Sequence, residues 1–196
     1  MPVLVVDNLS PFTPDILSCL DLLGADYACL AYSKVSTSDL VRSSNVILSG
    51  RRKNSREINV ANSRIVKHCF ESGKPLLGIC YGAEIIALTL GGTIRRMQDH
   101  VHGRIDVKIN TYNPLTDEKA TLSVYESHAY CVGRLPAEFT SLASSETCDH
   151  EMFSHIHKPV FGTQFHPEKS GVDGKALLEC FARIKEERFY LHEKKT

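Results

Sequence analysis

Cys80 lies between two glycines in the segment Gly78-Ile79-Cys80-Tyr81-Gly82, where an apolar run gives way to a helical pattern. A thiol at such a strand-to-helix turn can act as a nucleophile, and the flanking glycines relieve the crowding of a sharp turn. Free main-chain N–H groups and the dipole of the following helix favour a thiolate there. We therefore expect an exposed, partly ionised sulfur, with the Tyr81 N–H placed to stabilise an oxyanion. A buried structural cysteine is the alternative interpretation.

A candidate base for this thiol occurs later in the chain, at His166. Pro167 biases His166 toward extended backbone, and residues two apart in an extended segment point to the same side. Glu168 can then accept a hydrogen bond from one imidazole nitrogen while the other nitrogen faces a thiol. By itself His-Pro-Glu at a strand end indicates only a turn. Combined with the turn at Cys80, it predicts a relay of nucleophile, base and orienting carboxylate.

Alternating strands and helices are expected to position this relay. Buried strands are predicted at residues 3–6, 27–31, 46–48 and 76–79. Between them, one helix is predicted to be capped by Thr13, with Pro14 in its first turn, and to end at Gly24. A second helix presents residues 61–70 and stops at Gly73. This repetition implies right-handed crossovers and a parallel sheet covered on both faces.

Beyond Gly92 the pattern changes to short strands without intervening helices. The predicted strands are 93–97, 104–110, 121–126, 139–143, 150–156 and 160–165. We expect them to form an antiparallel extension of the same sheet, followed by a helix from 172 to about 190 that packs Leu177, Leu178, Phe181 and Ile184. With no linker and no repeat, residues 1–196 are predicted to be a single α/β domain.

The composition excludes several classes of protein. Lys and Arg together number 23, as do Asp and Glu, so no basic field points to nucleic acid or to a membrane surface. The apolar stretches are too short to span a bilayer, and the N-terminus has no signal-peptide pattern. The seven cysteines include no C-x-x-C pair, which disfavours a disulfide framework or a zinc site. We expect a reduced, cytoplasmic protein in which six cysteines are small apolar fillers.

Several motifs occur in the order found in one family. They are "VLVVDN" at the start, "ILSG" at 47–50, "GICYG" at 78–82, "LGG" at 90–92, "ESH" at 126–128 and "GTQFHPE" at 162–168. On these motifs the chain resembles the class I glutamine amidotransferases. The resemblance implies a three-layer, flavodoxin-like α/β fold with a mostly parallel central sheet, helices on both faces and an antiparallel extension. Within the family, the motifs are most similar to the glutaminase part of GMP synthetases.

The resemblance also implies a reaction. Cys80 would attack the side-chain amide of glutamine, His166 would move the protons and Glu168 would orient His166, through a γ-glutamyl thioester that is hydrolysed to glutamate. The ammonia would pass to a separate ATP-pyrophosphatase subunit that converts XMP to GMP. ATP and Mg are expected only on that partner, and no cofactor in this chain. The alternatives are another acceptor or γ-glutamyl substrate, and a weakly active regulatory or binding homologue.

The resemblance assigns further site residues, some of which depart from the family pattern. The oxyanion hole would comprise Tyr81, Arg51 and Gly50, and the substrate-binding residues would be Gly82, Glu84, Ser127, His128 and Ala129. The family has glycine where this chain has Arg51, and glutamine where it has Glu84. One hypothesis is a latch in which Arg51 and Glu84 pair across the empty pocket; a merely solvated basic loop is the alternative.

Two other features bear on a partner and on metals. GMP synthetases tend to carry an aspartate where this chain has Tyr130, which puts communication with a partner in doubt. The pairs His100/His102 and His155/His157 have the spacing of ligands on one strand face. With no third ligand at a recognisable spacing, we expect surface histidines and no metal site.

Overall fold

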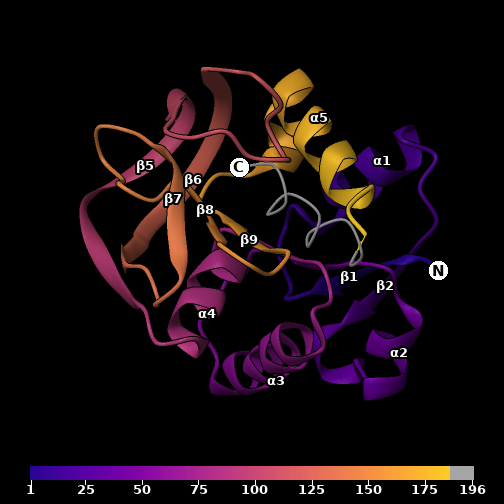
Figure 1. Ribbon diagram of the computed structural model, residues 1–196. Helices are drawn as coiled ribbons and strands as arrows, with labels where there is room; N and C mark the ends of the chain where they lie inside the picture. The colour runs from indigo at the N-terminus through magenta and orange to yellow at the C-terminus, as the bar shows by residue number, and fades with distance from the viewer. Residues whose placement is uncertain (186–196) are drawn as a thin grey trace.

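The structure is a computed structural model that describes residues 1–185. Nine strands form one sheet in the order β2-β1-β3-β4-β9-β8-β7-β5-β6 (Figure 1). The strands are β1 Val3–Asp7, β2 Tyr27–Ala31, β3 Val46–Leu48, β4 Leu76–Ile79, β5 Thr93–Ile109, β6 Thr121–Arg134, β7 Phe139–Ser144, β8 Met152–His155 and β9 Val160–Thr163. The helices are α1 Thr13–Leu22, α2 Thr37–Arg42, α3 Arg56–Ser72, α4 Tyr81–Thr89 and α5 Gly171–Ala182, with 3-10 turns Tyr32–Lys34 and Pro167–Lys169.

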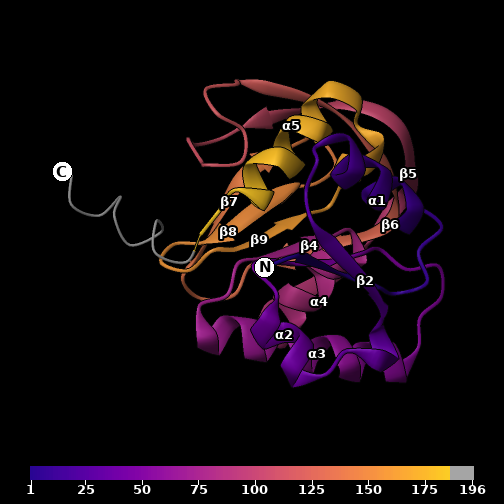
Figure 2. The same cartoon turned by 90° about the vertical axis from the view of Figure 1, so that its right-hand side faces the viewer.

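The first half of the sheet is parallel and covered on both faces. Strands β2, β1, β3, β4 and β9 pair in parallel. Helices α1 and α5 cover one face, and α2, α3 and α4 cover the other (Figure 2). Strands β2, β3 and β4 lie at their predicted bounds, and β3 and β4 are buried on both faces as their continuous apolar sequence predicts. The prediction of a buried strand is wrong for β2, an edge strand that is only partly buried. The predicted three-layer α/β fold is confirmed.

The second half of the sheet is the antiparallel extension that the sequence predicted. Strands β5 to β8 pair antiparallel, and β8 joins this half to β9. The separate strands predicted at 93–97 and 104–110 form one strand, β5, which bends where its register with β6 shifts between Arg96 and Val101. Helix α2 was not predicted. Helix α5 ends at Ala182, well short of 190, and the part of that prediction beyond 185 lies outside the described residues.

The ends of two helices show how well local signals predict boundaries. Thr13 is not the cap of α1: Phe12 holds that position, and the Thr13 hydroxyl donates to Asp7 Oδ1 at 2.7 Å. Helix α3 ends as predicted at Gly73, whose φ of 71° suits glycine. Among the described residues, no helix has the length and apolar character needed to cross a membrane.

The cysteines are not uniformly buried fillers. Cys69, Cys131 and Cys148 are buried, but Cys29 is exposed on the edge strand β2. The prediction of six apolar fillers is therefore wrong for Cys29.

Candidate active site

Cys80 occupies a strained turn between β4 and α4. Its φ of 51° and ψ of −105° lie in a region that side chains rarely adopt, so the surrounding structure must hold it there. A Cβ added to Gly78 would overlap the main chain of Gly82, and one added to Gly82 would overlap the carbonyl of Leu48. Both glycines are thus required by direct contact, and the turn presents Cys80 at the carboxyl end of a central strand.

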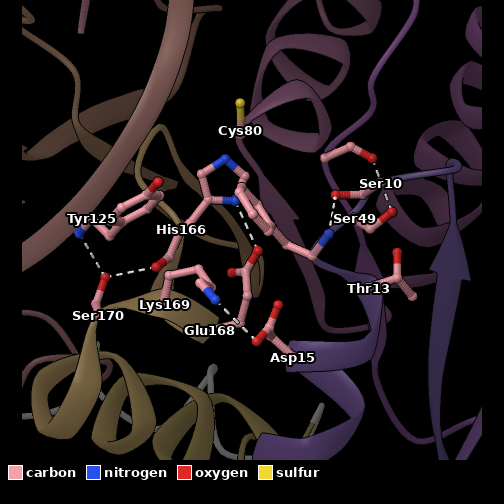
Figure 3. Close-up of polar contacts among 12 residues, drawn as sticks. Ser10, Thr13, Asp15, Ser49, Cys80, Tyr125, His166, Glu168, Lys169 and Ser170 are labelled. Carbon is pink, nitrogen blue, oxygen red and sulfur yellow. Dashed lines mark hydrogen bonds and ion pairs between the residues drawn. The ribbon is translucent and has the colours of Figure 1, made fainter. Parts of the chain in front are cut away.

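His166 and Glu168 lie beside this turn as a buried pair. Glu168 Oε1 accepts a hydrogen bond from His166 Nδ1 at 2.8 Å. The main chain of His166 is fixed in turn, because its N–H donates to the Tyr125 carbonyl and its carbonyl accepts from the Ser170 hydroxyl. Figure 3 shows the imidazole between the Glu168 carboxylate and Cys80. The Nε2 nitrogen is therefore the one left to exchange a proton with the thiol.

Gly50 shows how closely the thiol and the imidazole approach. A Cβ added to Gly50 would lie 3.2 Å from His166 Cε1 and 3.9 Å from Cys80 Cβ. Gly50 therefore borders both the imidazole and the cysteine side chain. The Phe12 ring packs edge-on against the imidazole with centroids 4.8 Å apart. Sequence reasoning missed Phe12, because nothing in its local pattern indicates that the start of α1 reaches the catalytic candidate His166.

The protonation state of Cys80 differs from the sequence-based expectation. The side chain is only 9% exposed, and burial raises the pKa of the thiol well above its usual range. The carboxylates of Glu84 and Glu126 raise it further, while the Tyr81 N–H lowers it. The prediction of an exposed, partly ionised sulfur is wrong, because desolvation and nearby carboxylates outweigh the helix N-terminus. The thiol needs a base to react, and His166 is placed to serve as one.

Arg51 does not form the hypothesised latch with Glu84. Its guanidinium carbon lies 3.8 Å from the centre of the Tyr81 ring, and its Nη1 donates to Asn59 Oδ1 at 2.6 Å. The Tyr81 hydroxyl donates to the same Asn59 oxygen at 3.0 Å. No ion pair joins Arg51 to Glu84 within the described part of the chain. The basic side chain is therefore docked on α3 and α4, and the latch hypothesis is wrong.

Glu84 is buried one helical turn after Cys80. Burial raises the pKa of its carboxyl, opposed by Arg51, by His128 and by a hydrogen bond from Gln164. The Gln164 amide nitrogen also lies 3.9 Å from the Cys80 sulfur. Gln164 thus links the two side chains. We did not predict it as a site residue, although it stands inside the "QFHPE" motif and alternation along an extended segment could have indicated it.

A second buried cluster lies behind the site. His128 Nε2 is 2.8 Å from Glu126 Oε2, and His128 Nδ1 donates to the Tyr130 carbonyl at 2.8 Å. Potential ligand atoms of Glu126, His128 and Glu151 all lie within 4.8 Å of one another, so these side chains are the candidates for holding a cation. Burial raises the pKa of both glutamates to about 8. Burial is the main cause in both groups, because it disfavours the ionised carboxylates.

The predicted substrate-binding residues fall into two groups. Glu84 lies near Cys80, and Ser127 and Ala129 are partly exposed on the face of β6 opposite to His128. The buried His128 side chain faces Glu126 and lowers the pKa of Glu84, so it lies on the side of β6 that faces Glu84. Gly82 packs against β3, which explains this glycine without a substrate contact.

The four histidines considered as metal ligands lie elsewhere. The rings of His100 and His102 stack with centroids 5.9 Å apart on the surface. The expectation of a surface histidine is wrong for His155, which is buried against Phe70 and Phe139. None of them belongs to a cluster of three potential ligands within residues 1–185.

Comparisons with known proteins agree with this geometry. The family model for class I glutamine amidotransferases matches residues 4–184. A glutamine-hydrolyzing GMP synthase subunit of Methanospirillum hungatei is 33% identical over 94% of this chain and 96% of its own. GMP synthase of Cronobacter sakazakii is 30% identical over 92% of this chain, which spans only 36% of that protein. A solved structure from Thermoplasma acidophilum, described as a GMP synthase subunit, superposes with a TM-score of 0.84 at 29% identity, covering 93% of this chain and 92% of its own.

Proposed function

The chain belongs to the class I glutamine amidotransferases, and we propose that it is the glutaminase subunit of a two-chain GMP synthase. The proposal of glutaminase activity rests on the arrangement of Cys80, His166 and Glu168. Cys80 has a strained backbone and lies beside His166, whose imidazole is oriented by the Glu168 carboxylate. The family hydrolyses glutamine, and this arrangement suits attack on an amide carbon. We propose that residues 1–196 act as one glutaminase domain.

The proposed reaction proceeds in two balanced halves. His166 takes the thiol proton as Cys80 Sγ bonds to the amide carbon of glutamine, and the resulting oxyanion is held by the N–H groups of Tyr81 and Arg51. The carbon–nitrogen bond then breaks, and His166 gives its proton to the departing ammonia. Water, deprotonated by His166, attacks the thioester, and the carbon–sulfur bond breaks to release glutamate and the free thiol. Glu168 holds the imidazole in one orientation throughout.

Substrate binding is proposed to use both sides of the pocket. The partly exposed strand segment of Ser127 and Ala129, with the main chain of His128, offers main-chain groups to the amino-acid end of glutamine. Glu84 offers acceptors near Cys80, which suits the α-ammonium group more than the α-carboxylate. Its buried position makes it selective, since an unpaired charge there costs free energy.

The partner is proposed from the lengths of the relatives. The Methanospirillum hungatei relative is similar in length to this chain, whereas the Cronobacter sakazakii protein is almost three times as long as the segment it shares with this chain. We propose that a separate ATP-pyrophosphatase subunit holds ATP and Mg and uses the ammonia to convert XMP to GMP. The glutaminase chain then needs no cofactor of its own.

A second candidate is a class I amidotransferase with another acceptor or γ-glutamyl substrate, or a weakly active homologue. Glu84 favours it, because a buried carboxyl stands where the family has glutamine and raises the pKa of Cys80. The intact set of Cys80, His166 and Glu168 favours efficient hydrolysis.

A glutaminase assay separates these candidates. Ammonia release from glutamine is measured for the full chain alone, and again with a GMP synthase ATP-pyrophosphatase subunit, ATP and XMP. We expect faster release and GMP formation with the complete mixture. Hydrolysis without any response to the partner, ATP or XMP would favour the second candidate, and no hydrolysis under any condition would overturn the proposed glutaminase.

A further inference from the structure

Arg51 is a predicted oxyanion residue whose side chain makes several contacts of its own. Its guanidinium stacks on Tyr81 at 3.8 Å and donates to Asn59 at 2.6 Å. Tyr81 donates its hydroxyl to the same Asn59 oxygen at 3.0 Å. The two residues whose N–H groups are expected to face the oxyanion are therefore joined by their own side chains, through one residue of α3.

The main chain at this point needs such a support. Arg51 lies in the loop between β3 and α3, and its N–H forms no hydrogen bond with any residue in the described range. The preceding Gly50 lies against both His166 and Cys80, so the Arg51 N–H belongs to the peptide that borders the reacting atoms. A donor stabilises an oxyanion only if it is already aimed at the developing charge. A free N–H at the start of a loop would otherwise be aimed only part of the time.

We propose that Arg51 is a positioning residue, whose side chain clamps its own N–H and that of Tyr81 into one oxyanion site through Asn59. The inference rests on the proposed thioester chemistry and explains a residue that departs from the family's glycine. A cation over an aromatic ring, combined with a hydrogen bond from a charged donor, supports such a clamp in a partly buried setting. The clamp is proposed to act on the transition state, through the contacts of the Arg51 side chain with Tyr81 and Asn59.

The test separates oxyanion binding from thiol reactivity. Iodoacetamide alkylates Cys80 without forming an oxyanion, whereas glutamate γ-semialdehyde adds reversibly to the thiol and places its oxygen in the oxyanion site. The rate of alkylation of the full chain is measured with increasing aldehyde, which gives the aldehyde concentration that protects Cys80. Arg51→Ala is compared with Arg51→Lys, with Asn59→Ala, and with Arg52→Ala as the matched control. Arg52 is an exposed neighbour with no contact among those described.

We expect Arg51→Ala to raise the protecting aldehyde concentration between about 10-fold and 10²-fold, because a donor is loosened but not deleted. The rate of alkylation without aldehyde should change much less than this, since iodoacetamide forms no oxyanion at the thiol. Arg51→Lys should recover part of the effect, and Arg52→Ala should show none. Combining Arg51→Ala with Asn59→Ala should add little to either single change, because both break the same contact.

In glutamine hydrolysis the same variants should lower kcat and leave KM nearly unchanged. Unchanged protection in Arg51→Ala, or tighter protection, would overturn the clamp while leaving the proposed function in place. Failure of the aldehyde to protect even the wild-type chain would overturn the proposed thioester chemistry, and the clamp with it.

Discussion

Within residues 1–185, two buried histidines each face a buried carboxyl of a residue nearby in the sequence. His166 and Glu168 are two residues apart, as are His128 and Glu126, and in each pair the closest nitrogen and oxygen lie 2.8 Å apart. They differ in the other ring nitrogen. In His166 this nitrogen is Nε2, which lies on the side of Cys80. In His128 it is Nδ1, which donates to the carbonyl of Tyr130.

A paired histidine therefore becomes a base only when a nitrogen remains free near a reacting group. His128 Nδ1 is bonded to a main-chain carbonyl, and its Nε2 faces the Glu126 carboxyl at 2.8 Å without the geometry of a hydrogen bond. His166 uses only Nδ1 for support and keeps Nε2 for proton transfer. Position in the sheet decides which outcome applies, since His166 follows the strand next to β4 and His128 lies on the far strand β6.

The largest contrast is expected between His166→Ala and His128→Asn. Removing His166 deletes the base and the proton donor, so kcat for glutamine hydrolysis should fall by about 10²-fold or more. His128→Asn should lower kcat by less than about tenfold and should mainly lower the melting temperature, because Glu126 loses its buried partner. The measurement is steady-state ammonia release with thermal unfolding of each variant. Equal losses of kcat would show that the two histidines do not differ in role.

A smaller contrast is expected between the two carboxylates. Glu168→Gln should lower kcat by more than Glu126→Gln does, because only Glu168 orients the base. Glu126→Gln should instead change stability with pH. The folded-state pKa of Glu126 is about 8 against an ordinary 4.5, so the folded protein holds a proton that the unfolded chain has lost between those values. The free energy of unfolding of the wild type should therefore fall as the pH rises from the unfolded-state to the folded-state pKa of Glu126. That of Glu126→Gln should fall less.

The effect is measured as the free energy of unfolding in urea at about pH 5.5 and about pH 8.5. Each pH lies within about one unit of one of the two pKa values. The two proteins should differ little at the lower pH, and Glu126→Gln should be the more stable at the higher. An identical decline in both would mean that Glu126 is not the buried acid responsible.

A moderate effect is expected from Glu84→Gln. The carboxylate raises the pKa of Cys80, so its removal should lower that pKa and move the rise of alkylation rate with pH toward lower pH. Glu71→Gln, an exposed change on α3, is the matched control and should leave the profile in place. No movement in the Glu84 variant would show that its charge does not reach the thiol.

The smallest effect is expected at Tyr130. This side chain is 47% exposed on β6, while its carbonyl fixes His128. Tyr130→Ala keeps the carbonyl, so partner-free hydrolysis should stay within about twofold. Any change should appear only as a weaker response to the ATP-pyrophosphatase partner. A large loss of partner-free activity would mean that Tyr130 supports the site itself.

The parallel half of the fold and the central site residues could be predicted from local sequence. Strands β2 to β4 are continuous apolar runs. Gly78 and Gly82 indicate the tight turn at Cys80, because a side chain at either position would overlap the main chain. His166 and Glu168 are linked by spacing alone, because two residues in extended backbone share a side.

The remainder depends on contacts between distant segments. Burial of the Cys80 sulfur follows from packing of several elements, and no local pattern carries it. Asn59 becomes a site residue only because α3 passes beside the Cys80 turn, where it meets both Arg51 and Tyr81. Glu151, the residue before β8, meets Glu126 of β6, and no spacing rule indicates this contact.

The proposed chemistry requires Cys80 to carry the γ-glutamyl group during hydrolysis. The full chain, with the ATP-pyrophosphatase partner, ATP and XMP, is mixed with glutamine and quenched in acid, and the peptide masses are then determined. We predict a γ-glutamyl thioester on Cys80 that decays as glutamate forms, and neither adduct nor ammonia release in Cys80→Ala. An adduct on another cysteine, or wild-type ammonia release by Cys80→Ala, would contradict this role of Cys80.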